Sequence, residues 1–92
     1  EAYDILTPLA DALVATHPLA AVLLWRSMID FSLTKARSGR YGHAARHLAS
    51  CTSVDMAIPD YGVHPIHEEY LNRLKTNHAR KASFWERVAD VV

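Results

Sequence analysis

The sequence predicts an all-α fold: a four-helix array with a central helical hairpin and a long C-terminal helix. Two observations indicate helices: alanine occurs 14 times and leucine ten, against 11 valines and isoleucines together, and no six-residue window alternates apolar with polar residues. The chain has 92 residues, of which 50% are hydrophobic and only seven are glycine or proline. A chain of this length and composition forms one globular domain, so we expect a single helical domain over residues 1–92.

Charge and cysteine content exclude several classes of protein. Ten basic residues balance ten acidic ones, so no global field attracts the protein to nucleic acid or to an anionic membrane. The single cysteine excludes an intrachain disulfide, and the longest apolar run, residues 18–25, is too short to span a bilayer. Because the chain opens without methionine and without a signal-peptide pattern, we expect a fragment of a longer cytoplasmic protein.

Prolines divide the first part of the chain into two predicted helices. Thr7 and Pro8 have the chemistry of an N-cap and a first helical turn, and Pro18 ends that helix near His17. Pro18 can itself begin a second helix of about twenty residues, which runs to residue 37. Gly39 then predicts a left-handed C-cap.

The second predicted helix, residues 18–37, is apolar around most of its circumference. Trp25 and Ile29 belong to one apolar row and Phe31 to the next, and Trp25 and Phe31 are expected to anchor the core. A helix with so wide an apolar arc has to be covered from two sides, so we predict that it is the central helix. Its main polar positions are Arg26, Asp30, Thr34 and Arg37.

The rest of the chain predicts two more helices. Residues 40–54 form a third helix whose inward face is rich in small side chains, with Tyr41, Leu48 and Thr52 among its inward residues. Residues 57–65 hold two prolines, an aspartate and a glycine, which is typical of a loop. Helical spacing of apolar residues then predicts one long fourth helix over residues 65–89, and the alternative is a break at Asn77.

Three segments resemble the C-terminal part of a bacterial protein family of unknown function. They are residues 36–48, 69–74 and 78–85, and the resemblance spans roughly residues 24–88. The second and third helices also resemble a tetratricopeptide-like hairpin, and similar helix pairs accompany SWIM zinc-finger proteins, although this chain lacks zinc-finger cysteines. The family pattern often has glycine where Ala79 and Ser83 stand here, which favours an unbroken fourth helix. The resemblance implies a C-terminal helical module of a longer cytoplasmic protein and implies no reaction.

Three residues on the third helix have the chemistry of metal ligands. His43, His47 and Cys51 stand at positions i, i+4 and i+8, so they lie on nearly one stripe. Since a helix rises about 1.5 Å per residue, only two adjacent side chains could reach one ion. We therefore predict no metal and no cofactor, and interpret the stripe as a partly buried polar seam. Metal binding through His43 and His47 is kept as an alternative.

No arrangement of residues predicts catalysis. Cys51 has His47 one turn away, but the interior of a helix lacks the N-terminal dipole and the oxyanion donors that reactive cysteines use. A small buried apolar side chain is the favoured interpretation of Cys51. We expect no enzyme and assign no catalytic residue.

Basic residues form two local groups that could contact a partner. One group surrounds the hairpin turn, and the other lies on the predicted fourth helix; together they are Arg37, Arg40, Arg46, Arg73, Arg80 and Lys81. Acidic neighbours and zero net charge favour a solvated helical face over nucleic-acid binding, which remains an alternative function.

The function that the sequence favours is a non-enzymatic interaction module. It would dock on the rest of its parent chain, on a second copy as a homodimer, or on another protein. Such a module predicts an exposed apolar patch above about 400 Å² that includes part of the first or second helix.

Overall fold

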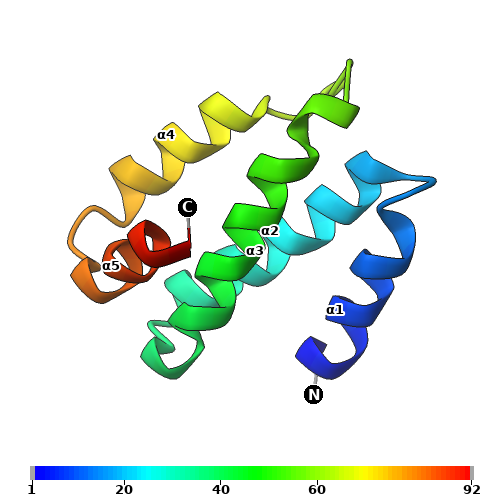
Figure 1. Cartoon of the computed structure of the whole chain (residues 1–92). Helices are drawn as coiled ribbons and strands as arrows, with labels where there is room; N and C mark the ends of the chain where they lie inside the picture. The colour runs from blue at the N-terminus through cyan, green and yellow to red at the C-terminus, as the bar shows by residue number, and fades with distance from the viewer. Residues whose placement is uncertain (1, 92) are drawn as a thin grey trace.

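The computed structural model describes residues 2–91 and, within them, the side chains of residues 5–90. Over residues 2–91 the fold is all-α, as predicted, with five α-helices and no strand (Figure 1). No helix in this range is long and apolar enough to cross a bilayer. The helices are α1 (Ala2–Leu13), α2 (Pro18–Thr34), α3 (Tyr41–Val54), α4 (His67–Asn77) and α5 (Ala82–Val91), with 3-10 turns at Ser38–Arg40 and Asp55–Ala57.

The start of α1 differs from the prediction. The helix begins at Ala2, so Thr7 is not its N-cap and Pro8 lies inside it. A proline inside a helix removes one backbone hydrogen bond. The helix continues through Pro8 because apolar residues on both sides of it pack on the core: Leu6 before it, and the fully buried Ala10 after it.

The C-terminal end of α2 is capped by an alanine and not by Gly39. The Ala36 N–H donates to the Leu33 carbonyl at 3.1 Å, and the Arg37 N–H donates to the Ser32 carbonyl at 2.9 Å. This pair of bonds is a Schellman motif, and it requires a left-handed residue at Ala36, whose φ is 52°. The prediction of a Gly39 cap was therefore wrong by three residues, because the helix ends at Thr34.

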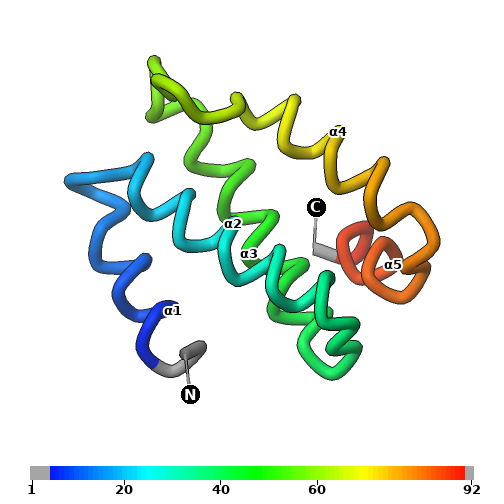
Figure 2. The backbone as a smooth tube through the Cα atoms, turned by 180° about the vertical axis from the view of Figure 1, so that it is seen from behind, coloured from blue at the N-terminus to red at the C-terminus, as the bar shows by residue number. Residues whose placement is uncertain are grey.

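Helix α2 lies between α1 and α3, as expected for a central helix (Figures 1 and 2). Trp25 and Ile29 are buried, which confirms that part of the predicted core. The prediction that Phe31 anchors the core was wrong, because its side chain is 46% exposed, with the Arg37 guanidinium 5.3 Å from its ring centre. Arg26, one of the polar positions of the helix, is only 5% exposed.

Helix α3 is a second central element, because it packs on α2 along one side and on α5 along the other. It begins one residue after the predicted start and buries Tyr41, Ala44, Ala45 and Leu48, whereas Thr52 is exposed. A side chain at Gly42 would place its Cβ 3.3 Å from Arg87 Nη1. The glycine therefore lets the Arg87 side chain of α5 lie close to the α3 backbone.

The long fourth helix was predicted wrongly, because the chain turns between Asn77 and Ala82 and forms α4 and α5. A straight helix over 25 residues would measure about 37 Å, which exceeds the 34 Å longest extent of the molecule. The break allows Phe84 to become fully buried and to meet Tyr41 edge-on at 6.1 Å. The Trp85 Nε1–H then donates to the His78 carbonyl at 3.0 Å, within the turn that joins the two helices.

Candidate functional site

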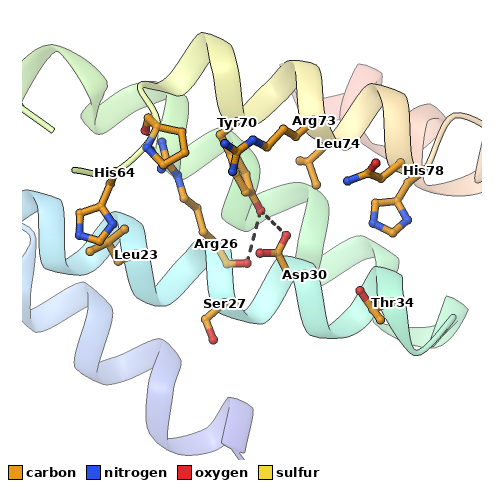
Figure 3. Close-up of a pocket in the computed structure, with 12 residues that line it drawn as sticks. Leu23, Arg26, Ser27, Asp30, Thr34, His64, Tyr70, Arg73, Leu74 and His78 are labelled. Carbon is orange, nitrogen blue, oxygen red and sulfur yellow. Dashed lines mark hydrogen bonds between the residues drawn. The ribbon is translucent and has the colours of Figure 1, made fainter. Parts of the chain in front are cut away.

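A pocket of about 660 Å³ lies where α4 crosses α2 (Figure 3). Only two residues of α4, Tyr70 and Leu74, are buried, so this helix contacts the rest of the fold through few side chains. Both helices and the segment before α4 line the pocket. The lining residues are Leu23, Arg26, Ser27, Asp30, Thr34, His64, Pro65, Tyr70, Arg73, Leu74, Asn77 and His78.

Arg26 is a buried cation at the inner wall of this pocket. Its guanidinium carbon lies 5.2 Å from the ring centre of Tyr61 and 4.6 Å from that of Tyr70. Its Nη1 donates to the Pro65 carbonyl at 2.8 Å, while Nε and Nη2 have no hydrogen-bond partner. Buried polar groups are nearly always hydrogen-bonded in folded proteins, so two unpaired guanidinium nitrogens are an unusual feature.

Tyr70 joins α4 to the backbone and to one carboxyl of α2. Its hydroxyl donates to Asp30 Oδ1 at 2.9 Å and lies 3.3 Å from the Arg26 carbonyl oxygen (Figure 3). Burial, the charge of Asp30 and this hydrogen bond all raise the pKa of Tyr70. Burial also raises the pKa of Asp30, against the lowering effect of the Tyr70 hydrogen bond. The phenol therefore remains protonated and acts as a donor.

Basic side chains surround the rest of the pocket. Arg73 is an exposed residue of α4, and His64 and His78 stand at opposite ends in Figure 3. Burial, followed by the nearby Lys81 charge, lowers the pKa of His78. Two permanent cations, Arg26 and Arg73, thus line the pocket together with one carboxyl, Asp30, whose charged form is disfavoured. The lining is suited to an anionic group.

An apolar groove of about 360 Å³ adjoins the pocket along α2. Leu23 lines both the pocket and the groove. The groove continues from Leu23 toward the start of α2 and the loop after α3, and its other lining residues are His17, Pro18, Leu19, Ala20, Ala57, Ile58, Pro59 and Asp60.

The three predicted metal-ligand candidates do not converge. His43 is exposed, with Nδ1 2.7 Å from Arg46 Nη2, whereas His47 is buried with Nε2 3.5 Å from Thr7 Oγ1. The Cys51 thiol lies 4.0 Å from the Val22 carbonyl oxygen. Within the part of the chain that the structure describes, no three His, Cys, Asp or Glu side chains could hold a metal ion together.

The electrostatics of the same helix also oppose nucleophilic chemistry. Burial raises the pKa of the Cys51 thiol to about 12, so the thiolate is not formed near neutral pH. Burial, with smaller effects of His43 and Arg46, lowers the pKa of His47 to about 4. Cys51 is fully buried, which confirms its interpretation as a small apolar side chain.

The six predicted basic interaction residues are distributed over several elements. Only Arg73 lines the α2–α4 pocket. Arg46 and Arg87 both lie beside Gly42, at the contact of α3 with α5. Arg37 and Arg40 belong to the turn after α2, and Arg80 and Lys81 to the turn before α5. Nucleic-acid binding by these residues therefore remains a prediction.

Most of the pocket residues are not identified by the sequence alone. The sequence marks Arg26 and Asp30 only as polar positions of α2, and it marks Tyr70 only as part of an apolar series. One signal is present: Arg26 and Asp30 stand four residues apart in a helix that is otherwise largely apolar, so they share one face. The sequence does not indicate that α4 covers this face.

Comparison with protein families identifies the chain. The model of a family of unknown function (DUF6880) matches residues 1–87, so the chain belongs to this family. The match confirms the expected relation to a family of unknown function and also includes α1, which lies outside the segments that carry the resemblance. Searches of curated proteins and of solved structures find no match.

Proposed function

We propose that this chain is a non-catalytic protein-interaction module that binds a peptide segment of its partner in the α2–α4 pocket. The observation that carries the proposal is Arg26, a buried cation with two unpaired nitrogens at the wall of a surface pocket. Leaving such donors unpaired costs about 1 to 3 kcal/mol or more, and a bound acceptor is one way in which this cost is recovered.

The size and composition of the pocket also support binding. A volume of about 660 Å³ is within the range of about 300 to 1,000 Å³ that is usual for ligand sites. Charged and hydrogen-bonding groups alternate with Leu23, Pro65 and Leu74, so the site offers both polar and apolar contacts. An extended peptide presents both kinds of group.

The chemistry of the reactive side chains supports a non-catalytic function. Cys51 is protonated and inaccessible, and Tyr70 is a hydrogen-bond donor with a raised pKa. His47 lies under α1 on the side of α3 that Thr7 contacts, and it lines none of the pockets described above. None of these groups is placed to attack a molecule bound between α2 and α4.

Exposed apolar side chains offer a further surface for partners. Ile5 and Leu9 of α1 and Phe31 of α2 are exposed, as are Met56 and Val63 at 96% each. The predicted apolar patch above about 400 Å² remains a prediction, as does homodimer formation through it.

Site-specific photo-crosslinking in cells tests the proposed function. A photoreactive amino acid is placed at Ser27, an exposed residue of the pocket wall, and, as a matched control, at Ser83, an exposed residue of α5. We expect a discrete crosslinked protein from position 27 and none from position 83. Equal crosslinking at both positions, or a discrete product only at position 83, would contradict a partner site in this pocket.

A further inference from the structure

We propose that the α2–α4 pocket recognises an acidic peptide, with an aspartate or glutamate side chain of the partner bound between Arg26 and Arg73 and a neighbouring apolar side chain in the groove beyond Leu23. This inference rests on the proposed function and adds the chemistry of the partner.

The charges of the pocket favour a carboxylate. Arg26 and Arg73 are fixed cations on opposite helices, and His64 and His78 add imidazole donors. Among the described residues that line the pocket, Asp30 is the only acidic one, and it already accepts the Tyr70 hydroxyl at 2.9 Å. An incoming carboxylate therefore meets an excess of positive charge, whereas an incoming cation would meet two cations and one carboxyl.

The surroundings of Arg26 make its guanidinium a specific hydrogen-bond donor for a bound acceptor and not merely part of a charged surface. The ring centres of Tyr61 and Tyr70 lie 5.2 Å and 4.6 Å from the guanidinium carbon, and the Pro65 carbonyl accepts a hydrogen bond from Nη1. These contacts restrain the guanidinium, and its Nε and Nη2 edge is left without a partner. A guanidinium edge with two N–H groups matches the two oxygens of a carboxylate. A rotation of Tyr70 or of the Arg26 side chain is needed to bring this edge to the ligand, because both nitrogens are covered in the unbound protein.

The adjoining groove specifies the second feature of the peptide. It shares Leu23 with the pocket and is lined largely by apolar residues such as Pro18, Leu19 and Ile58. A peptide that places its carboxylate beside Arg26 and follows α2 toward Pro18 passes over this groove. An apolar side chain near the acidic one would remove both surfaces from water.

Selection from a random peptide library tests the proposal. The immobilised 92-residue chain is used as bait, and the selected peptides are synthesised with a fluorescent label for anisotropy titrations. We expect enriched peptides with an aspartate or glutamate next to an apolar residue. We also expect their affinity to fall as NaCl is raised from low to physiological concentration, because exposed charge pairs are screened.

Three variants separate the possible outcomes. Arg73→Glu should weaken binding of the selected peptides about tenfold or more, because it replaces an attractive contact with a repulsive one. Arg46→Glu, which reverses an equally exposed charge outside the pocket, should leave the affinity within about twofold. Ser27→Trp should abolish binding by filling the pocket, and circular dichroism checks that all three variants remain folded.

Each contrary result has a defined meaning. Selected peptides that need an open pocket but carry no acidic residue would overturn the acidic-peptide inference and leave the proposed function intact. Selected peptides that bind Ser27→Trp as well as the original chain would overturn both. A single-stranded DNA oligonucleotide could compete for binding as effectively as the acidic peptide and fail to bind Arg73→Glu. That result would overturn the inference in favour of a nucleic-acid ligand.

Discussion

The two sides of α2 are built from different chemistry. Toward α1 and α3 it presents Val22, Ile29 and Leu33, all fully buried, and the neighbouring helices cover them with apolar and small side chains. Toward α4 it presents Arg26 and Asp30, and Tyr70 of α4 contacts both of them. The first side closes into a core. The second side leaves a pocket, because a few polar contacts hold the helices without filling the space between them.

The energies of the two sides differ accordingly. Each fully buried Val, Leu or Ile side chain contributes about 1.5 to 3 kcal/mol to stability. The two contacts of Arg26 with tyrosine rings contribute about 0.5 to 2 kcal/mol each, but its two unpaired nitrogens cost about 1 to 3 kcal/mol or more. The α4 side therefore adds little net stability, and the fold depends mainly on the apolar side. Substitutions on each side test this difference, in descending order of their effect.

The largest effect is expected from Phe84→Ala on the apolar side. The phenylalanine is fully buried between Tyr41 and Trp85, so its removal leaves a cavity and should lower the free energy of unfolding by about 3 to 5 kcal/mol. Urea denaturation followed by circular dichroism measures the change, with the exposed Ser83→Ala as control. A loss below about 1 kcal/mol would mean that α5 does not complete the core.

The second effect is a dependence of stability on pH that arises at α3. The pKa of His47 is about 4 in the folded chain, against an ordinary value of 6.5. Between pH 4 and pH 6.5 the unfolded chain therefore binds more protons at this residue than the folded chain does. Stability is then complete above about pH 6.5 and is lost as the pH falls toward 4, by about 3 kcal/mol for this residue. The lowered pKa values of His67 and His78 act in the same direction, whereas the raised pKa of Asp30 acts in the opposite direction.

A substitution isolates this effect from the other titrating groups. His47→Gln should flatten the fall in stability between about pH 6.5 and 4, whereas His43→Gln, at an exposed position one turn away, should not. Urea denaturation at a series of pH values measures both. An unchanged slope in His47→Gln would show that this imidazole is not held neutral by the fold.

The third effect tests the polar side of α2 directly. Arg26→Met keeps a long side chain beside Tyr61 and Tyr70 and removes the unpaired nitrogens, so stability should change by less than about 1.5 kcal/mol. Arg26→Ala leaves the space empty and should cost about 2 kcal/mol or more. Thermal and urea denaturation of both variants measure the difference. A loss above about 3 kcal/mol in Arg26→Met would show that the cation itself stabilises the fold.

The smallest effect is expected at the end of α2. Ala36 has φ 52°, a conformation that costs an L-residue about 1 to 2 kcal/mol, whereas glycine adopts it freely. The greater flexibility of glycine in the unfolded chain offsets part of this gain, so Ala36→Gly should stabilise the fold by about 0.5 to 1 kcal/mol. A rise in melting temperature checks it. Gly39→Ala is the control, because Gly39 has neither a positive φ nor a neighbour within 4 Å of an added Cβ. A fall in the melting temperature of Ala36→Gly would contradict the Schellman cap.

The apolar side of the molecule could be predicted from the sequence, since helical spacing alone marks Trp25, Ile29 and Leu48 as core. The start at Pro18 and the loop after α3 followed from the fixed geometry of proline. Sequence rules for helix boundaries failed where contacts with residues far along the chain determine where a helix begins or ends. Pro8 lies inside α1 because residues on both sides of it are covered by other elements, and α4 ends at Asn77 because Phe84 has to reach Tyr41.

The pocket could not be predicted for the same reason. An arginine within an apolar helix is normally assigned to solvent, and only the fold brings the rings of Tyr61 and Tyr70 close to its guanidinium. These tyrosines are 35 and 44 residues further along the chain, on a loop and on α4. No spacing rule within one helix connects them to Arg26.

The most direct test of the pocket as a binding site is a nuclear magnetic resonance titration. The ¹⁵N-labelled chain is titrated with an acidic peptide obtained from the library selection, and amide and arginine Nε–H shifts are followed. Binding in the pocket predicts the largest changes at Ser27, Asp30 and Arg73 and at the Arg26 side chain. If the largest changes fell instead on the exposed apolar residues of α1, or on the exposed face of α3 around His43, the site would lie elsewhere.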